Sequence, residues 1–379
     1  MHFEDKNQKV CFLLTHVPNP RMNKRITAFK ELMPVEVICA RRASQNIWEP
    51  EHSDIKHTIL DVDLPQSSKI FKRMKVSSGF RKDMFRLLEE MKPTIVYSEG
   101  LDTLMVAVDY KNKHECKLFF EVSDLRESFI EKPKGFIKRC VTEVISIKEK
   151  ELFKFIDKLV ITSPKFFDLH YCKLISKENT VFVPNAPDLS AFSDFKHKKG
   201  GIFTVGFIGG IRYLTQMKML VDAASDLNIK VVFAGAGGTS GEYEEIQEYC
   251  KEKDNVCFTG RYDYGKDIAN LYGMVDCVYS VYNADNPNVR IALPNKLYEA
   301  VYCNLPIIVA KGTYLEEVVK DWGVGLSVGH TNTEELTQAL QKLKYDDAIY
   351  KTISDACDNR KKDIIRMREF NLIEALIGD

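Results

Sequence analysis

Short apolar runs rich in Val, Ile and Phe alternate with longer amphipathic or charged stretches, and this alternation constrains the fold more than any single residue does. In the first half of the chain the runs are VCFLLT at 10–15, VEVICA at 35–40, TIVYSE at 94–99, LFFEVS at 118–123 and LVITS at 159–163. Strands buried on both faces have this composition, and the long intervening stretches are typical of helical crossovers. The pattern predicts a parallel α/β sheet.

A second series follows FSDFKHKKGG at 192–201, a polar segment that ends in two glycines and indicates a linker. Its runs are FTVGFIGG at 203–210, KVVFAGAGG at 230–238, NVCFTG at 255–260, DCVYSVY at 276–282, LPIIVAKG at 305–312 and VGLSVG at 324–329. Two consecutive α/β sheets are the simplest interpretation. The last stretch, 346–379, is charged at first and then apolar, which predicts one or two amphipathic helices.

The balance of charge limits the classes of partner. Lys and Arg together number 54, as do Asp and Glu, so the net charge is zero and no overall field favours nucleic acid. Any anion site has to be local. The 10 cysteines include no C-x-x-C pair, which favours reduced core thiols over disulfides or a zinc site. The polar start MHFEDKNQKV, and the lack of an apolar run of roughly 20 residues, lead us to expect a cytoplasmic protein.

The first candidate site is IGGIRYLTQMK at 208–218. Gly209 and Gly210 end a predicted strand, and paired glycines allow the backbone to approach a phosphate closely. Arg212 carries a planar fork of donors that suits two phosphate oxygens, and Lys218 follows it. The alternative interpretation is a tight turn with a solvated arginine.

The second candidate site is NADNPNVRIALPNKLYEAVYCNLPIIV at 283–309. Pro294, Asn295 and Lys296 predict a helix start, with Pro near the first helical position and Asn able to cap it, and such a helix end attracts an anion. Glu299 lies one turn further on, where a carboxylate can accept hydrogen bonds from the hydroxyls of a ribose. The alternative is a solvated glutamate on a helix surface.

In their order, the motifs GFIGGIRY, VVFAGAG, NVCFTGR, DCVYSVY and PNKLYEAVYCNLPIIV resemble the donor-binding domain of retaining GT-B glycosyltransferases, those grouped with sucrose and bacterial surface-polysaccharide synthases (family 4-like, group 1). The similarity spans 203–330, and FEVSDLRES, VITSPKFFDLHY and VPNAPD match more loosely in the first half. The resemblance implies a GT-B fold: two Rossmann-like, doubly wound parallel-sheet domains that face each other across a cleft. Residues 1–192, joined by a terminal helix at 360–379, would bind the acceptor, and 200–359 the nucleotide-sugar.

Carried over by position, the resemblance implies that Glu299 holds the ribose hydroxyls and that Arg212 and Lys218 neutralise the diphosphate leaving group. Many members have a further glutamate eight positions before the ribose-binding one, Glu299, and here that position is Ile291. Candidate substitutes are Arg290, Asn295 or Lys296. The expected donor-binding residues are Gly209, Gly210, Arg212, Gly235, Arg290, Pro294, Asn295, Lys296, Leu297 and Glu299.

Loops at strand ends of the first domain, at 15–25 and 121–128, are candidates for the acceptor site. The expected acceptor-binding residues are His16, Asn19, Arg21 and Arg126. Asp124 lies beyond a strand end, where related enzymes place a polar group near the transferred sugar, so it joins Arg212, Lys218 and Glu299 as a candidate catalytic residue. A capping role for Asp124 and a polar loop role for His16 are the alternatives.

Departure of the diphosphate builds negative charge, so electrostatic stabilisation should carry much of the catalysis. No metal-binding D-x-D motif between strands is evident. The one such sequence considered, DVD at 61–63, is followed by Leu-Pro, and we interpret it as structural. We predict no metal and no cofactor, with the two basic residues and a helix N-terminus in their place. The resemblance implies retaining transfer from a nucleotide-diphosphate sugar to a saccharide or lipid-linked saccharide, in surface-polysaccharide or glycan biosynthesis. A GT-B epimerase and a non-catalytic sugar-nucleotide-binding protein are the alternatives.

Basic and apolar residues are interleaved at 67–88, and KPKGFIKR at 132–139 repeats the mixture. The cations of the first stretch are Lys69, Lys72, Arg73, Lys75, Arg81, Lys82 and Arg86, and its apolar residues include Ile70, Phe71, Met74, Phe80 and Phe85. Such sequences suit an anionic membrane surface, near which each cation contributes about 1 kcal/mol. The hypothesis is a protein peripheral to the inner face of the plasma membrane; a solvated helix face is the alternative.

Overall fold

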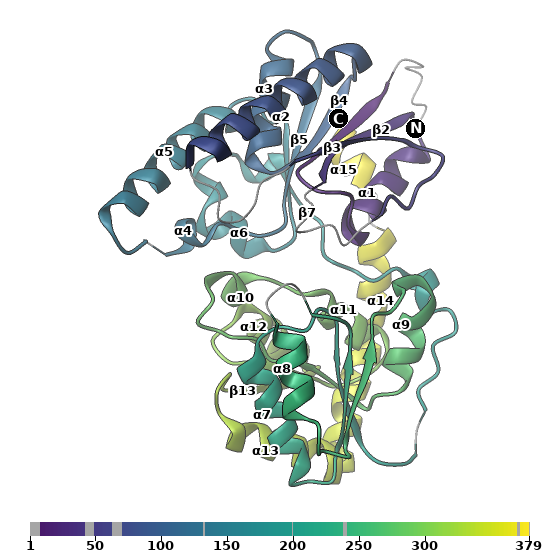
Figure 1. Ribbon diagram of the computed structural model, residues 1–379. Coiled ribbons are helices and arrows are strands. Elements are labelled where there is room, and N and C mark those ends of the chain that lie inside the picture. Colours follow the sequence, from purple (N-terminus) through teal and green to yellow (C-terminus); the bar gives the residue numbers. More distant parts are fainter. Residues whose placement is uncertain are drawn as a thin grey trace. The chain divides into compact units, whose positions relative to one another are not determined.

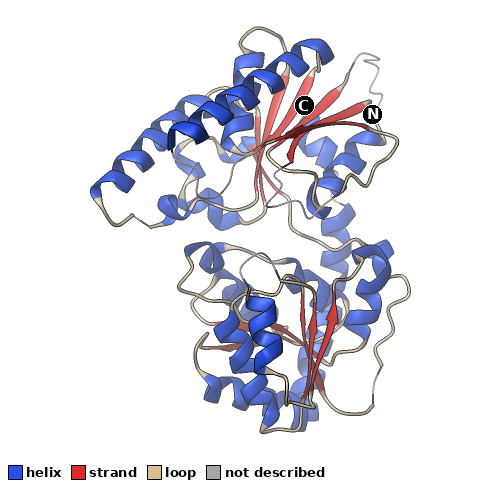
Figure 2. Ribbon diagram, in the orientation of Figure 1, coloured by secondary structure: helices blue, strands red, loops and turns tan. Residues whose placement is uncertain are grey.

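The chain divides into two compact units in the computed structural model of Figure 1. The first unit comprises Met1–Val183 and Asn371–Asp379, and the second comprises Pro184–Phe370. The structure describes residues 8–41, 49–62, 70–131, 133–198, 200–237, 241–369 and 372–378. Each unit is a parallel sheet with helices on both sides (Figure 2), so the prediction of two doubly wound α/β units is confirmed.

The first unit contains a seven-stranded parallel sheet with the order β3-β2-β1-β4-β5-β6-β7. Its strands are β1 (Val10–Leu14), β2 (Val35–Arg41), β3 (Lys56–Asp61), β4 (Ile95–Glu99), β5 (Lys117–Val122), β6 (Lys158–Ile161) and β7 (Thr180–Phe182). The helices are α1 (Pro20–Lys30), α2 (Ile70–Met91), α3 (Leu101–Lys111), α4 (Glu127–Ile130), α5 (Phe136–Phe153), α6 (Pro164–Leu169) and α15 (Leu372–Ile377). The strands β1 and β4 are buried along their whole length, as their continuous apolar runs predict.

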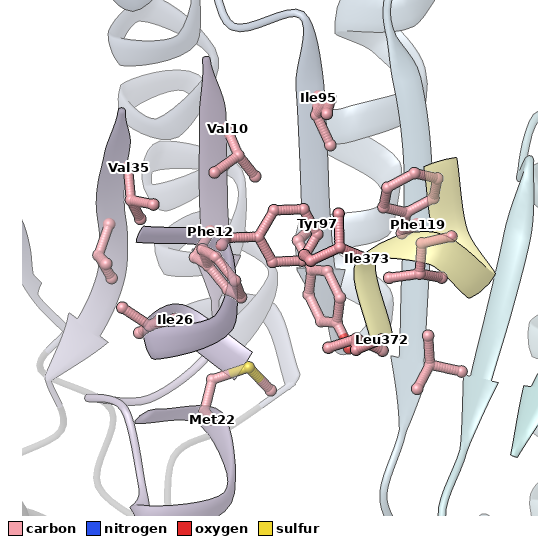
Figure 3. Packing of buried hydrophobic residues seen from close by; sticks show 14 of the residues in the cluster. Val10, Phe12, Met22, Ile26, Val35, Ile95, Tyr97, Phe119, Leu372 and Ile373 are labelled. Atoms are coloured by element: carbon pink, nitrogen blue, oxygen red, sulfur yellow. The ribbon is translucent and has the colours of Figure 1, made fainter. Parts of the chain in front are cut away.

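Aromatic side chains from neighbouring strands form the centre of this unit. Phe12 of β1 stacks on Tyr97 of β4 with ring centroids 4.8 Å apart, and Phe29 of α1 meets the Phe12 ring edge-on at 5.6 Å. Leu372 and Ile373 of α15 belong to the same cluster (Figure 3). The last described helix of the chain thus completes the core of the first unit.

The second unit contains a six-stranded parallel sheet with the order β10-β9-β8-β11-β12-β13. Its strands are β8 (Thr204–Ile208), β9 (Lys230–Ala234), β10 (Val256–Gly260), β11 (Cys277–Ser280), β12 (Ile307–Ala310) and β13 (Gly325–Val328). The helices are α7 (Leu214–Ser225), α8 (Glu242–Tyr249), α9 (Tyr264–Gly273), α10 (Pro287–Ile291), α11 (Asn295–Tyr302), α12 (Tyr314–Trp322), α13 (Thr333–Tyr345) and α14 (Asp347–Glu369). Among the described residues, no helix combines the length and apolar character needed to cross a bilayer.

Candidate functional site

The sheet of the second unit reverses its direction of growth between β8 and β11. Strands β9 and β10 lie on one side of β8, whereas β12 and β13 lie beyond β11. Ligands of doubly wound sheets bind outside the carboxyl ends of the strands at such a reversal. A ligand is therefore expected to bind at the residues that follow Ile208 and Ser280.

Two glycine turns meet at this edge. The Gly209 N–H donates to the Ala234 carbonyl at 2.8 Å, and the Gly235 N–H donates to the Gly260 carbonyl at 2.9 Å. Both glycines have left-handed backbone, with φ of 140° at Gly209 and 139° at Gly235. A Cβ at Gly235 would lie 2.0 Å from the Gly209 carbonyl oxygen. Only glycine allows these two turns to approach so closely.

Lys296 brings a positive charge to the first glycine turn. Its Nζ lies 2.8 Å from the position of a Cβ on Gly209, donates to the Tyr282 hydroxyl at 2.9 Å, and lies 4.7 Å from the centre of the Phe207 ring. Phe207 belongs to β8, and Tyr282 follows β11, so the ammonium group lies over the reversal of the sheet. Lys296 was among the expected donor-binding residues and was also a candidate substitute for the missing glutamate, and it is the cation that the structure places beside Gly209.

The start of α11 lies at the same lysine. Pro294 occupies the N-cap position and Asn295 the first helical position, so the prediction that Asn295 caps this helix is wrong. Proline has no side-chain acceptor, and no side chain in the described part of the chain caps α11. The backbone N–H groups of the first turn give a helix N-terminus its partial positive charge. Leu297 is fully buried, so its side chain packs in the core.

The two basic residues of the first candidate motif point to different neighbours. Arg212 is exposed, and its Nε lies 3.7 Å from the position of a Cβ on Gly210. The ammonium group of Lys218 lies 5.0 Å from the centre of the Tyr249 ring on α8. The Tyr249 hydroxyl in turn donates to Asp222, one turn further along α7, at 2.7 Å. Arg212 thus stays beside the glycine turn, whereas the contacts described for Lys218 are with α8.

Glu299 is buried, unlike a solvated glutamate on a helix surface. It is 4% exposed, and it accepts hydrogen bonds from Tyr264 at 2.7 Å and Tyr272 at 2.6 Å, one on each carboxylate oxygen. Burial, and then the negative charge of Glu299, raise the pKa of both tyrosines far above its ordinary value. Both phenols therefore remain hydrogen-bond donors to the carboxylate at neutral pH.

Neither of these two tyrosines was predicted from the sequence as part of the site. Tyr264 and Tyr272 are eight residues apart on α9, which is the spacing of two helical turns and places both on one face. That spacing was the available signal. Ile291 is buried at the end of α10, and Arg290 precedes it on the same short helix.

A polar cluster occupies the carboxyl ends of β1 and β4 in the first unit, around Glu99. Arg21 Nη2 donates to Glu99 at 2.6 Å, Ser123 donates at 2.9 Å, and the His16 ring nitrogen lies 3.3 Å from the carboxylate. Asn19 contacts His16 at 3.3 Å and caps α1 by accepting from the Met22 N–H at 2.9 Å. Three of the four predicted acceptor-binding residues thus gather around one carboxylate that the sequence analysis did not single out.

A second carboxylate lies beneath this cluster. Glu121 is 1% exposed, and it pairs with Arg21 at 3.0 Å and Arg25 at 3.3 Å, while the Tyr97 hydroxyl donates to it. Burial alone would raise the pKa of Glu121, but the charges of Arg25 and Arg21 lower it below its ordinary value. Arg21 therefore bridges two carboxylates and is held in place from both sides.

The remaining predicted residues of the first unit lie after β5. Asp124 is exposed in the bend that follows this strand, and exposed Arg126 occupies the N-cap position of α4. Asp61, from the D-x-D sequence, ends β3 and pairs with Arg41 at 3.1 Å, whereas Asp63 lies outside the described residues. Across the described ranges, no group of three or more His, Cys, Asp or Glu is arranged to hold a metal ion.

The two stretches that were expected to bind a membrane lie at α2 and α5. The side chains of 67–76, which include Lys69, Lys72, Arg73 and Lys75, lie outside the described residues. In the described part of α2, Phe80 and Phe85 are half-buried, Arg81 donates to the sulfur of Met105, and Arg86 pairs with Glu90 at 2.8 Å. The second half of KPKGFIKR, residues 136–139, forms the first turn of α5 (Phe136–Phe153).

Part of the chain is similar to a known protein family and to a curated relative. Residues 191–361 match the family glycosyl transferases group 1. The succinoglycan biosynthesis protein ExoL of Rhizobium meliloti is 22% identical over 268 residues, which span 66% of this chain and 64% of ExoL, so the match covers less than two thirds of that relative.

Solved structures extend the likeness over the whole chain. Sucrose-phosphate synthase from Thermosynechococcus elongatus has a TM-score of 0.69 at 14% identity, covering 96% of this chain and 97% of that one. HepE from Anabaena, solved in complex with UDP, has a TM-score of 0.69 at 14% identity, covering 96% and 98%. Residues 191–361, which are less than half of the chain, thus match the glycosyl transferases group 1, and the chain as a whole has the GT-B fold.

Proposed function

We propose that the chain is a glycosyltransferase that moves a sugar from a nucleotide-diphosphate sugar to a saccharide or lipid-linked saccharide, in the biosynthesis of a surface polysaccharide or glycan. One observation carries the proposal: Lys296, the Gly209 turn and the uncapped start of α11 converge where the sheet of the second unit reverses. This arrangement supplies backbone amides and a fixed cation to an anion.

The diphosphate leaving group is the anion that this site suits. As the bond from the anomeric carbon breaks, negative charge grows on the phosphate oxygens, and preformed positive groups stabilise it. Lys296 and the α11 amides supply such groups, and exposed Arg212 adds a fork of donors beside Gly210. On this basis we propose a metal-independent reaction.

In the proposal, Glu299 holds the ribose hydroxyls. Each oxygen of an ionised carboxylate can accept two hydrogen bonds, so the bond from one tyrosine leaves capacity for a further donor. Tyr264 and Tyr272 then fix the orientation of the carboxylate before the donor arrives. Retention of the anomeric configuration is also part of the proposal, and it rests on the resemblance of the motifs.

The acceptor is proposed to bind the first unit at the cluster around Glu99. A sugar acceptor needs partners for its hydroxyl groups, and His16, Arg21 and Ser123 present nitrogen and oxygen atoms around one carboxylate there. Asp124 and Arg126, exposed after β5, are proposed as further contacts.

The test begins with donor binding, using UDP as the first probe because the similar HepE was solved with it. Calorimetric titration with UDP, GDP and ADP in the presence of EDTA should show saturable binding of one of them. The matching nucleotide-sugars are then incubated with the protein, with and without a panel of saccharide acceptors. Release of the nucleoside diphosphate with formation of a glycoside supports transfer. Isomerised donor without release would indicate an epimerase, and binding without any conversion would indicate a binding protein.

A further inference from the structure

An outward-facing apolar surface covers the first part of α5. In the described part of the chain, 11 large hydrophobic side chains are exposed, and five of them lie within 136–147. They are Phe136, Ile137, Val141, Val144 and Ile147, and their exposed fractions run from 51% to 80%. Single exposed apolar residues are normal on a protein surface, whereas a contiguous group of them marks an interaction site.

The five residues lie on one face of the helix. Ile137, Val141 and Val144 follow a spacing of four and three residues, and Phe136 and Ile147 lie in the adjoining row with exposed Cys140 between them. An amphipathic helix of a soluble protein normally turns this face toward the core. Here the opposite face, with Thr142, Ile145 and Ser146, is the less exposed one. We refer to the surface of Phe136, Ile137, Val141, Val144 and Ile147 as the α5 apolar face.

The second half of α5 fixes the helix to its unit. Glu149 is 4% exposed and accepts from His170 at 2.7 Å. Phe153 is buried, stacks on Tyr171 with ring centroids 5.2 Å apart, and meets Phe120 of β5 edge-on at 5.8 Å. The apolar face is therefore presented by a rigidly anchored helix, whose start extends beyond the strands of its sheet (Figure 1).

Cations surround the exposed end of this helix. Lys134, Lys138 and Arg139 are exposed, and the sequence from 133 to 142 contains no acidic residue. Further along the helix, Lys148 pairs with Glu151 at 3.6 Å and Glu143 is exposed, so the positive charge is concentrated within 134–139. A partner that takes up the α5 apolar face must therefore tolerate several positive charges at its edge, which disfavours a second copy of the same face.

We propose that the α5 apolar face docks on the surface of an anionic lipid bilayer. Helices that lie in a membrane interface insert an apolar face among the acyl chains and keep lysine and arginine at the level of anionic headgroups. The α5 helix provides both parts. Phe80 and Phe85 of the earlier candidate stretch are half-buried, whereas the five residues of the α5 apolar face are exposed. This inference does not depend on the proposed transfer reaction, because it concerns where the protein binds.

Flotation with lipid vesicles tests the proposal. Full-length protein is mixed with vesicles of phosphatidylcholine alone or with about one third phosphatidylglycerol, which supplies the negative surface potential that attracts basic segments. The mixtures are separated on a density gradient at low and high salt. We expect the protein to float with anionic vesicles, to float less at high salt, and to remain largely unbound with neutral vesicles. Equal binding to both vesicle types, or no binding to either, would overturn the proposal.

Two variants locate the surface. In the first, Phe136, Ile137 and Val144 are changed to Ser, with Leu32, Ile202 and Tyr345 changed to Ser as a control, since these are also more than half exposed. In the second, Lys134, Lys138 and Arg139 are changed to Gln, with the exposed Lys251, Lys266 and Lys320 changed to Gln as its control. Each α5 variant should reduce the bound fraction at least tenfold at equal melting temperature, and each control should bind normally.

The alternative occupants are outcomes of the same experiment. If the α5 serine variant floats like the unchanged protein, the apolar face is not the lipid contact. If light scattering shows a dimer that this variant dissociates, and vesicles capture neither protein, the face joins two copies and the proposal is wrong. The glutamine variant gives an independent answer because its changes leave the apolar side chains in place.

Discussion

The carbonyl oxygen of Gly209 approaches the backbone of Gly235 so closely that a Cβ on Gly235 would lie 2.0 Å away from it. Gly235→Ala should therefore separate the two turns. We expect a loss of about 3 kcal/mol in the free energy of unfolding, from overpacking and from the left-handed φ together. Nucleotide binding should weaken as well, because the Gly209 amide would move. Chemical denaturation and calorimetry measure the two effects.

Gly312→Ala is the matched control. Gly312 also has a left-handed φ, of 74°, but a Cβ there would meet nothing within 4 Å. Its cost should be limited to strain of about 1 kcal/mol. Equal losses in the two variants would show that the close approach at Gly235 is not tight in solution.

The second prediction separates two lysines. Lys296→Met removes the ammonium group beside Gly209, and we expect UDP affinity to fall roughly 10- to 100-fold, as loss of a hydrogen bond from a charged group implies. Lys218→Met should change affinity less than about threefold, because the Lys218 ammonium lies over Tyr249. Calorimetric titration compares both variants with the unchanged protein. The opposite order would return the diphosphate to Lys218.

The third prediction concerns the support of Glu299. Tyr272→Phe leaves a buried carboxylate oxygen without its phenol donor, and we expect a loss of about 2–3 kcal/mol in the free energy of unfolding. Tyr279→Phe is the control, because Tyr279 is equally buried and donates to the uncharged Gln216 carbonyl at 2.9 Å. That change should cost about 1 kcal/mol. Urea denaturation of both variants at neutral pH provides the comparison.

The fourth prediction follows from the lowered pKa of Glu121. A carboxyl group with a pKa below its ordinary value in the folded state stabilises the fold above the unfolded pKa, and loses this contribution as pH falls through the folded pKa. Glu121→Gln should cost about 3–5 kcal/mol at pH 7, since Arg25 then remains buried without a charged partner. The difference between variant and unchanged protein should shrink below about pH 4. Denaturation midpoints from pH 7 to pH 3 test this, and a difference that does not vary with pH would contradict it.

The fifth prediction concerns the end of the chain. Ile373 and Leu376 of α15 are buried in the core cluster of the first unit. Changing either to Ala should lower the free energy of unfolding by about 2–4 kcal/mol, as expected for truncation of a buried aliphatic side chain. Ile202→Ala, at a side chain that is 59% exposed, should change it by less than about 0.5 kcal/mol. Thermal melting of the full-length variants is the measurement.

The sheet strands were predictable because burial on both faces leaves continuous apolar runs. VCFLLT and TIVYSE coincide with β1 and β4, which lie in the middle of their sheet. The strand β3 was missed, since it is an edge strand with exposed ends and carries Lys, His and Asp. Sequence patterns report the environment of a strand, so edge strands leave a weaker signal than central ones.

Site residues were predictable only as far as local chemistry decides them. The glycines at 209 and 235 could be found, because close backbone approach demands that residue. The buried state of Glu299 could not be found from its own helix, since it depends on Tyr264 and Tyr272 of α9. The pairing of Arg21 with Glu99 and Glu121 joins residues 78 and 100 positions apart. Such pairings follow from sheet topology, which a local motif does not contain.

The α15 side chains in the first core have a consequence for the order of events in the cell. During translation, Val10 and Phe12 emerge from the ribosome long before Leu372 and Ile373 are synthesised, yet all four lie in one hydrophobic cluster. The core of the first unit therefore remains incomplete while the whole second unit is translated. During that interval its unfilled apolar surface is open to molecular chaperones, and only the arrival of the last helix closes it.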